Sequence, residues 1–512
     1  MIISLSVLVI TIIVSGTYAL YKAQLSKNIG VNTTTHGLAY YINYVKGTDI
    51  TAATLNPSTS YEGGASSDIE FWKKDDSYDI YGKIELTVNT IGTNLSNSPA
   101  LKYAVVNNGN VLKEGSLKGT TSGSKVTILK NLYLEQTKQI YTVYVWLDNS
   151  EELGNISNES LSISVDCTAS LQKEPAADTI ISLYTSAAKV TATNNSITYN
   201  TAPSVSLMND RLGGTTTSLD GGNIRYYGAS PNNYIYFNCS DYSNQTSSTC
   251  ETWRIIGVFD GKLKLIRGSQ IGKYSWDNKN ISTGAEDDRG KNDWTTARLM
   301  KLLNPDDYYI NDNNDKDSEG NYLGYSLYYN SASGMCFTDE GVNYSACDFT
   351  STGIKNDETR NMIAETTYNL GGWNDTGVYP NEIYEYERGT TVYTGRPTTW
   401  TGKIALAYPS DYGYAADLNQ CKQTLVNYDN STCTSNNWMK NIVTNNGGNY
   451  GWLLTHRPDS SSSTWTVRRE GLANNISEAS GGLGVVPVLS LSSELGIESG
   501  DGSSSNPYKL SA

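Results

Sequence analysis

A chain of 512 residues has room for about two or three domains, each able to bury a core. Its formal net charge of −14 argues against nucleic acid or an anionic membrane surface as a partner, because phosphate binding needs a basic surface. Charged residues make up 18% of the chain, whereas Asn, Ser, Thr, Gly and Tyr are abundant, which favours β-rich domains with long polar loops.

The chain begins with an apolar segment, MIISLSVLVITIIVSGTYALYKA, which carries no charged side chain before Lys22. A helix of about 20 residues rises about 30 Å, enough to cross the hydrocarbon core of a bilayer. We therefore predict that residues 1–21 form a transmembrane helix, or a signal peptide cleaved near the small residues 15–19. Lys22 and Lys27 would place the following chain in the cytoplasm, but the cysteine pattern described below favours export.

Two zones with different patterns follow. Residues 22–65 are irregular and predict a stalk or an edge strand, whereas residues 66–170 alternate apolar and polar side chains. The alternating runs are YGKIELTVNTI, ALKYAVVN, KVTILKNLYL, QIYTVYVWLD and LSISVDC. Turn segments such as NNGN and TTSGS separate them, so the pattern predicts an antiparallel β-sandwich.

Residues 171–194 change to helical spacing. Apolar side chains gather on one side of the segment, and these are Ile180, Ile181, Leu183 and Tyr184. We predict a helical connector here, before a larger domain at residues 195–512.

The larger domain holds six of the seven cysteines, in three segments of similar length: CSDYSNQTSSTC (239–250), CFTDEGVNYSAC (336–347) and CKQTLVNYDNSTC (421–433). Zinc sites usually place ligands about two to four residues apart, but the chain has no CxxC and two His. Disulfide-closed loops fit better and imply an oxidising, extracytoplasmic compartment. We predict Cys239–Cys250, Cys336–Cys347 and Cys421–Cys433, with Cys167 unpaired. The first bridge would lie at the base of a hairpin formed by YIYFNC and ETWRIIGVF.

Several motifs resemble known surface proteins. NIRYYGASPNNYIYFNC (223–239), ETWRIIGVFDGKLKLIRG (251–268), WTGKIALAYPSDYGYA (400–415) and SGDGSSSNPYKLSA (499–512) resemble a family of uncharacterised surface proteins from low-GC Gram-positive gut bacteria. That resemblance implies a surface location and no particular activity. SGTYALYKA resembles the signal region of the camelysin and TasA group, secreted sandwich proteins with matrix-fibre and surface roles.

The C-terminal region also resembles C-type-lectin-like domains in its layout. Such domains combine long loops with a small sheet and end in a strand that returns beside the first. WRIIGVF would open the module, and segments 450–460, 464–471 and 484–492 would close it. The predicted fold class is mainly β with an α+β C-terminal domain: an N-terminal membrane helix or signal segment, a β-sandwich, and a loop-rich C-type-lectin-like domain.

Two segments have some features of calcium sites. Trp373-Asn374-Asp375 matches a ligand triplet of sugar-binding C-type lectins, but Pro380-Asn381-Glu382 follows it, in the reverse of the lectin order. We interpret the triplet as a packed tryptophan followed by an Asx turn. NDNNDKDSEGN (311–321) would need a glutamate at the closing position of an EF-hand, where Ser326 stands, so a solvated loop is favoured. We predict no metal and no cofactor.

Catalytic patterns are weak. No G-x-S-x-G motif follows a strand, and His456 in LLTHRPD would end a strand or face solvent. NEIYEYERG, read at period two, gathers Glu382, Glu385 and Glu387 near aromatic residues, where a glycosidase would need two facing carboxylates. We interpret this segment as a loop with charge pairs and predict no enzymatic activity.

Aromatic rings among polar loops are typical of surfaces that bind sugars or proteins. We predict an adhesin-like cell-surface protein, anchored in the cytoplasmic membrane through its N-terminal helix, whose C-terminal domain binds a glycan or a host or bacterial surface protein. The candidate ligand-binding residues, unless they belong to the core, are Trp373, Tyr384, Trp400, Trp452 and Trp465. Two alternatives stay open: a fibre subunit assembling through sandwich edge strands, and a glycan hydrolase using the three glutamates.

Overall fold

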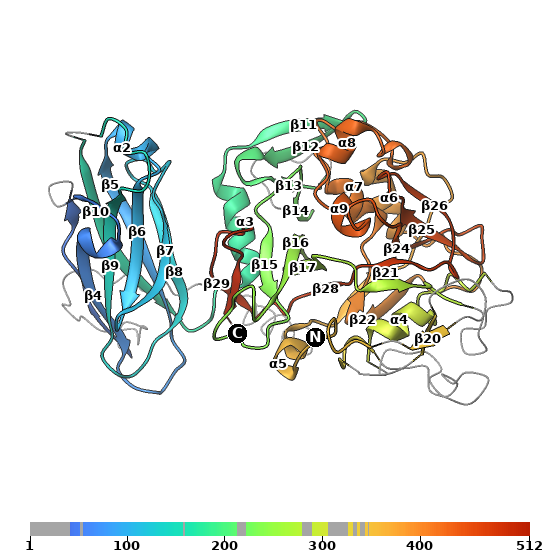
Figure 1. Cartoon of the computed structure of the whole chain (residues 1–512), viewed down its shortest axis with the longest axis horizontal. Helices are drawn as coiled ribbons and strands as arrows, with labels where there is room; N and C mark the ends of the chain where they lie inside the picture. Colours follow the sequence, from blue (N-terminus) through green and yellow to red (C-terminus); the bar gives the residue numbers. More distant parts are fainter. Residues whose placement is uncertain are drawn as a thin grey trace, which may run out of the picture. The chain divides into compact units, whose positions relative to one another are not determined.

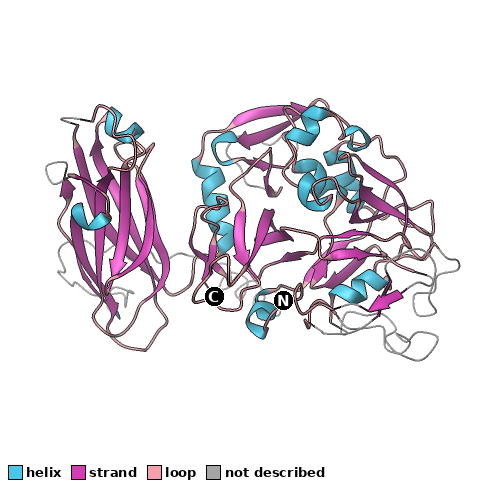
Figure 2. Cartoon of the chain, viewed as in Figure 1, coloured by secondary structure: helices cyan, strands magenta, loops and turns pink. Residues whose placement is uncertain are grey.

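The computed structural model describes residues 41–51, 55–156, 159–211, 222–278, 289–305, 326–330, 335–337, 344–346 and 348–511. The fold is mainly β, with 38% strand and 15% helix (Figures 1 and 2). One compact unit, the N-terminal unit, ends at Glu174 and includes Ile497–Ser499; the other, the C-terminal unit, comprises Pro175–Gly496 and Gly500–Leu510. The predicted membrane helix or signal segment at 1–21 lies outside the described residues. Within the described ranges, no helix is long and apolar enough to span a bilayer.

The N-terminal unit is a sandwich of two sheets. Its first sheet has the order β1-β4-β9-β6-β7, with β3 beside β9, and its second has the order β2-β10-β5-β8. The strands are β1 (Ile42–Val45), β2 (Ile50–Thr51), β3 (Pro57–Ser58), β4 (Ala65–Lys73), β5 (Tyr81–Ile91), β6 (Leu101–Asn107), β7 (Asn110–Ser116), β8 (Lys125–Tyr133), β9 (Ile140–Asp148) and β10 (Leu161–Ser170). Short helices are η3 (Tyr61–Gly63) and α2 (Thr93–Asn97). All five predicted alternating runs are strands.

Period-two alternation explains why the two sheets pack face to face. In β4, every second residue from Ala65 to Lys73 is buried, and β5 follows the same alternation along most of its length. Inward-facing apolar side chains of both sheets form one core, for example Phe71 of β4 and Leu86 of β5. The predicted turn NNGN joins β6 to β7 through Asn108 and Gly109, whose φ angles of 49° and 78° are those of a tight hairpin.

Cys167 lies in β10 and is buried and free of any disulfide, as predicted. Burial raises the pKa of its thiol, so it behaves as a small apolar side chain of the core. The segment predicted as a stalk or edge strand contributes β1, an edge of the first sheet, and the short β2 and β3; residues 22–40 lie outside the described ranges.

The C-terminal unit is built on a nine-stranded sheet, in the order β11-β12-β13-β14-β16-β17-β28-β23 with β15 beside β16, and on a five-stranded sheet, β18-β27-β24-β25-β26. The strands of the larger sheet are β11 (Val190–Asn194), β12 (Ile197–Ala202), β13 (Leu207–Asn209), β14 (Ile224–Tyr226), β15 (Tyr234–Phe237), β16 (Glu251–Phe259), β17 (Lys262–Arg267), β23 (Ile404–Ala405) and β28 (Val488–Ser490). Those of the smaller are β18 (Gly272–Tyr274), β24 (Gly451–His456), β25 (Ser463–Val467), β26 (Ala473–Glu478) and β27 (Leu483–Val485).

Two-stranded pairs and short helices complete the described elements. The pairs are β19 (Met335–Phe337) with β20 (Tyr344–Ala346), β21 (Thr366–Asn369) with β22 (Thr399–Gly402), and β29 (Gly496–Ser499) with β30 (Lys509–Ser511). The helices are α3 (Ala176–Ser186), η4 (Pro203–Val205), α4 (Arg298–Leu303), α5 (Asp357–Met362), α6 (Pro380–Glu387), α7 (Pro409–Tyr414), η7 (Leu425–Asn427), α8 (Ser431–Ser435) and α9 (Lys440–Val443).

Helix α3 lies within the segment predicted to be helical. It packs on β14, β16 and β17 and buries Ile180 and Tyr184, so it covers the larger sheet of its own unit (Figure 1). The predicted opening strand is β16, and the predicted closing segments contain β24, β25, β27 and β28. The returning strand β28 pairs with β17, which is the neighbour of β16.

Two of the predicted disulfides are present in the C-terminal unit. Cys239–Cys250 joins Cα atoms 3.9 Å apart beside the antiparallel pair β15 and β16, at the base of the predicted hairpin. Cys421–Cys433 joins Cα atoms 4.6 Å apart. The third pair stays a prediction, because Cys347 lies outside the described residues. Disulfides of this kind are compatible with an extracellular protein.

The segment NEIYEYERG is helical, so the prediction of a loop with period-two alternation is wrong. Pro380 occupies the first turn of α6, where its fixed φ suits a helix, and a carboxylate oxygen of Glu382 accepts a hydrogen bond from the backbone N–H of Tyr379 at 2.8 Å. Ile383 and Glu387, four residues apart, share the buried face. Over so few residues, the sequence pattern fits both the two-residue period of a strand and the 3.6-residue period of a helix. Pro380 in the first turn and the capping contact of Glu382 favour the helix.

Candidate functional site

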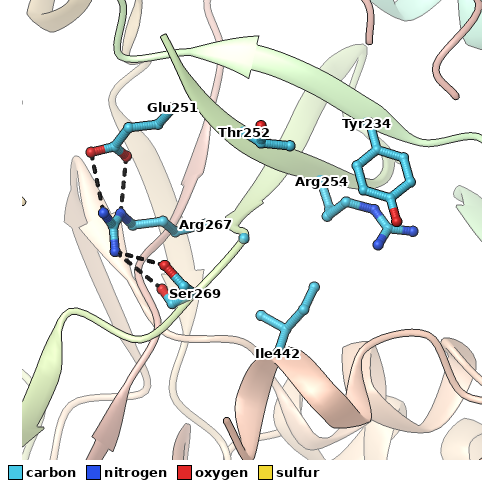
Figure 3. A pocket seen from close by; sticks show the side chains of 8 residues that line it. Tyr234, Glu251, Thr252, Arg254, Arg267, Ser269 and Ile442 are labelled. Atoms are coloured by element: carbon cyan, nitrogen blue, oxygen red, sulfur yellow. Dashed lines mark hydrogen bonds and ion pairs between the residues drawn. The ribbon is translucent and has the colours of Figure 1, made fainter. Parts of the chain in front are cut away.

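A pocket of about 420 Å³ opens in the C-terminal unit where β15, β16 and the end of β17 approach α9 (Figure 3). Its lining is mostly polar: Tyr234, Glu251, Thr252, Arg254, Arg267, Gly268, Ser269 and Ile442. Tyr234 and Arg254 are direct cross-strand neighbours, and strand alternation puts Thr252 on the same face as Arg254. The pairing of β15 with β16 therefore fixes an aromatic ring, a hydroxyl and a guanidinium beside one another.

Arg254 is 7% exposed and is held by neutral groups. Its Nε donates to Oδ1 of Asn233 at 2.5 Å, and one terminal nitrogen donates to the carbonyl of Pro231 at 3.3 Å. The guanidinium carbon lies 3.7 Å from the ring centroid of Tyr234 and 4.9 Å from that of Trp438. Burial lowers the pKa of Arg254 to about 10, which leaves the side chain charged at neutral pH.

The second arginine of the pocket is paired with an acid. Nε and one terminal nitrogen of Arg267 donate to the two carboxylate oxygens of Glu251 at 2.9 and 3.2 Å. The Nε1–H of Trp253 also donates to Glu251, at 3.0 Å. Figure 3 shows this pair on one side of the pocket and Arg254 with Tyr234 on the other. The Glu251–Arg267 pair is electrically balanced, so Arg254 gives the lining its net positive charge.

A separate buried ionic network lies between β14, β17 and α7. Asp411 accepts hydrogen bonds from a terminal nitrogen of Arg225 at 2.9 Å and from Nζ of Lys264, while Nε of Arg225 donates to Asp210 at 2.6 Å. Although burial opposes it, Lys264 and Arg225 hold the pKa of Asp411 below its ordinary value. All four side chains are buried and every charge has an opposite charge beside it, so this network braces the core.

Three of the five candidate aromatics belong to the core. Trp400 is 5% exposed, Trp452 2% and Trp465 0%. Trp452 Nε1 donates to the carbonyl of Tyr274 at 2.8 Å, and Trp465 belongs to the main apolar cluster of the C-terminal unit. A ligand at the surface does not reach these rings, so they support the fold.

The other two candidates are half-buried. The guanidinium carbon of Arg388 lies 3.4 Å from the ring centroid of Tyr384. The hydroxyl of Tyr384 accepts a hydrogen bond from Nδ2 of Asn223 at 2.9 Å. Both the ring and the hydroxyl of Tyr384 therefore contact other residues of the chain. Trp373 stacks on Tyr386 with centroids 3.7 Å apart and planes within 5°. The structure thus does not gather the five candidates around one groove.

The Asx-turn interpretation of Trp373-Asn374-Asp375 is confirmed. Oδ1 of Asp375 accepts from the backbone N–H of Gly377 at 2.8 Å, and Nδ2 of Asn475 donates to the carbonyls of Trp373 and Asn374. Within the part of the chain that the structure describes, no three His, Cys, Asp or Glu side chains gather as metal ligands. The second calcium candidate, 311–321, lies outside that part.

The three glutamates of α6 have separate surroundings. Glu382 caps the helix and Glu385 is exposed. Glu387 is fully buried and accepts hydrogen bonds from the backbone N–H and the hydroxyl of Ser410, and burial raises its pKa to about 7. His456 ends β24 as expected but is 4% exposed and does not face solvent; burial lowers its pKa to about 4.

Comparisons with known proteins add little. No protein-family model matches the chain, and no curated protein matches it significantly. Crystal structures titled as HCR/D mutants, one with a tryptophan and one with a phenylalanine changed to alanine, share 12% and 11% identity. They cover 52% and 51% of this chain and 76% and 75% of their own, each with a TM-score of 0.16. At that score the likeness carries no argument.

Sequence reasoning missed the pocket residues, although they lie in quoted motifs. ETWRIIGVF places Arg254 inside an otherwise apolar strand, and NIRYYG does the same with Arg225. A buried arginine needs an acid, an aromatic ring or a polar cavity beside it. A lone arginine in an apolar strand is therefore a signal that the sequence contains. The partner of each arginine, however, lies far along the chain: Asp411 for Arg225 and Trp438 for Arg254.

Proposed function

We propose that this chain is an extracytoplasmic surface protein that binds a glycan in the pocket beside β15 and β16. The observation that carries the proposal is the pocket itself: about 420 Å³, within the range of small-ligand sites, with a polar lining around one aromatic ring. Thr252 and Ser269 offer hydroxyls, and the part of the half-buried Tyr234 ring that Arg254 does not cover offers apolar area for a sugar. The disulfides agree with a location outside the cytoplasm.

The test is a glycan array probed with the full chain, followed by titration of the bound glycans. Replacing Tyr234 by Ala is expected to weaken binding about fivefold, since the ring contact is worth about 1 kcal/mol. Tyr236→Ala is the matched control, because Tyr236 has the same orientation on β15 but does not line the pocket. Equal loss in both variants, or no bound glycan at all, would contradict the proposal.

A fibre subunit is the second candidate, and the edge strand β7 favours it. In the order of its sheet β7 pairs with β6 alone, and the side chains of Val111 and Leu112 are 43% and 38% exposed. If the sandwich polymerises through this edge, Val111→Lys should abolish filaments seen by electron microscopy of the purified protein. Monodisperse particles of the unaltered chain at high concentration would rule against a polymer.

A further inference from the structure

Arg254 is a buried cation with no acid to balance it. Its two hydrogen bonds go to a side-chain amide and a backbone carbonyl, and its two ring contacts are to neutral aromatics. Among the described residues, no carboxylate lies within ion-pair distance of it. Burying a charge without a counter-charge lowers the stability of the fold. A protein keeps such a residue where its function needs the charge.

The nearest acid of the pocket does not relieve this cost. Both oxygens of Glu251 are engaged by Arg267, and one of them also by Trp253. Arg267 is further held by the carbonyls of Ser269 and Gln270 at 3.3 Å, so the pair is fixed in place. Among the described residues, the pocket therefore offers no acid that is free to balance Arg254, and a bound anion would supply that charge.

The position of Arg254 decides what kind of anion fits. The guanidinium lines a pocket large enough for a sugar ring, with a tyrosine ring beside it and hydroxyls nearby. Its Nε and one terminal nitrogen donate to Asn233 and Pro231, and the other terminal nitrogen has no acceptor among the described residues. Arginine and a carboxylate form strong, directional hydrogen bonds.

We propose that the pocket selects an acidic sugar, whose ring carboxylate binds the guanidinium of Arg254 while Tyr234 and the hydroxyls of Thr252 and Ser269 contact the rest of the ring. This inference rests on the proposed glycan-binding function and names its ligand class. Uronic acids and sialic acids both carry such a carboxylate. Both form pyranose rings, and they differ in the length of the carbon chain and in the substituents beside the carboxyl group.

Titration of the full chain with matched acidic and neutral probes tests this. The probes are an oligogalacturonate and its methyl ester, and sialyllactose and lactose. Each acidic probe class that binds is expected to bind at least about tenfold more tightly than its neutral partner, since a charge-assisted hydrogen bond is worth about 1.5–3 kcal/mol. Arg254→Gln should remove this preference, and Arg254→Lys should keep part of it.

A second variant avoids the risk that a change at Arg254 unfolds the protein. Thr252 is exposed and lies on the same face of β16, so Thr252→Glu supplies an internal counter-charge without a change in the core. It should abolish acidic-probe binding, whereas Thr252→Gln removes only the hydroxyl contact and should weaken acidic and neutral probes alike, so that the acid preference remains. Equal affinity for acidic and neutral probes, or an acid preference that survives in Arg254→Gln and Thr252→Glu, would overturn the inference and leave glycan binding intact. Failure of every probe and array glycan to bind would overturn the proposed function itself, and this inference with it.

Discussion

Replacing Asp411 by Asn is expected to destabilise the C-terminal unit by about 3–5 kcal/mol, the usual cost of removing one partner from a buried ion pair. Asp411 is 1% exposed and accepts from Arg225, Lys264 and the backbone N–H of Tyr408. An amide of the same shape can accept from some of these donors but cannot neutralise two cations. Arg225 keeps Asp210 as a partner, so the uncompensated charge falls mainly on Lys264.

Denaturant unfolding followed by tryptophan fluorescence measures this effect, because eight of the ten Trp lie in the C-terminal unit. Asp429→Asn, an exposed aspartate in the same unit, is the matched control and should change the free energy of unfolding by less than about 0.5 kcal/mol. Adding Lys264→Met to Asp411→Asn should restore part of the loss, because it removes the stranded cation. A loss below about 1 kcal/mol would show that the network contributes little to stability.

The sequence predicts the N-terminal unit well because its residues obey one local rule. Strands of about seven to eleven residues alternate between core and surface along much of their length, most regularly in β4 and β5, and the turns carry Asn and Gly. Strand β7 is as long as β6 but escaped prediction, because most of its side chains are exposed on an edge and it has no apolar alternation.

The C-terminal unit was harder to predict because its strands pair over long distances. The neighbours of β17 are β16, which adjoins it in sequence, and β28, which begins at Val488. Local patterns located these strands and the local disulfides, but they do not show which aromatic rings the assembled sheets cover. Trp465 lies in a segment that reads as half polar, STWTV, yet it is fully buried, because its face of β25 packs into the main apolar cluster of the C-terminal unit.

The candidate site illustrates the same limit at the level of single side chains. Arg225 and Arg254 look equivalent in sequence, each a lone cation in an apolar strand. Their different roles come from distant partners: two aspartates enclose Arg225, whereas asparagine, tyrosine and tryptophan surround Arg254. The presence of a paired acid therefore distinguishes the structural Arg225 from Arg254, the candidate ligand-binding residue. Which side chains lie beside each arginine is seen in the folded structure and not in the sequence.

Replacing Glu387 by Gln is expected to stabilise the protein at alkaline pH and to have little effect in acid. Burial raises the pKa of Glu387 from 4.5 to about 7 in the folded state; Arg388 opposes this rise, while Asp411 adds to it. A raised pKa means that the folded chain holds the proton more tightly, so the stability it contributes is complete below about pH 4.5 and is lost as the pH rises through about 7. Since each tenfold change in proton affinity is worth about 1.4 kcal/mol, the loss at about pH 8 amounts to roughly 3 kcal/mol.

Glutamine should avoid that loss, because its amide can make the hydrogen bonds of the protonated acid: Oε1 accepts from the backbone N–H of Ser410, and Nε2 donates to the hydroxyl. The free energy of unfolding of Glu387→Gln minus that of the unaltered chain should therefore rise from near zero at about pH 4 to roughly 3 kcal/mol at about pH 8. Taking the difference cancels the other buried groups that titrate in this range, Asp277 and His456. Glu385→Gln, on the exposed side of the same helix, should show no such rise. A flat difference across this pH range would mean that Glu387 is ionised in the folded protein, with Arg388 supplying enough compensation to keep its pKa near 4.5.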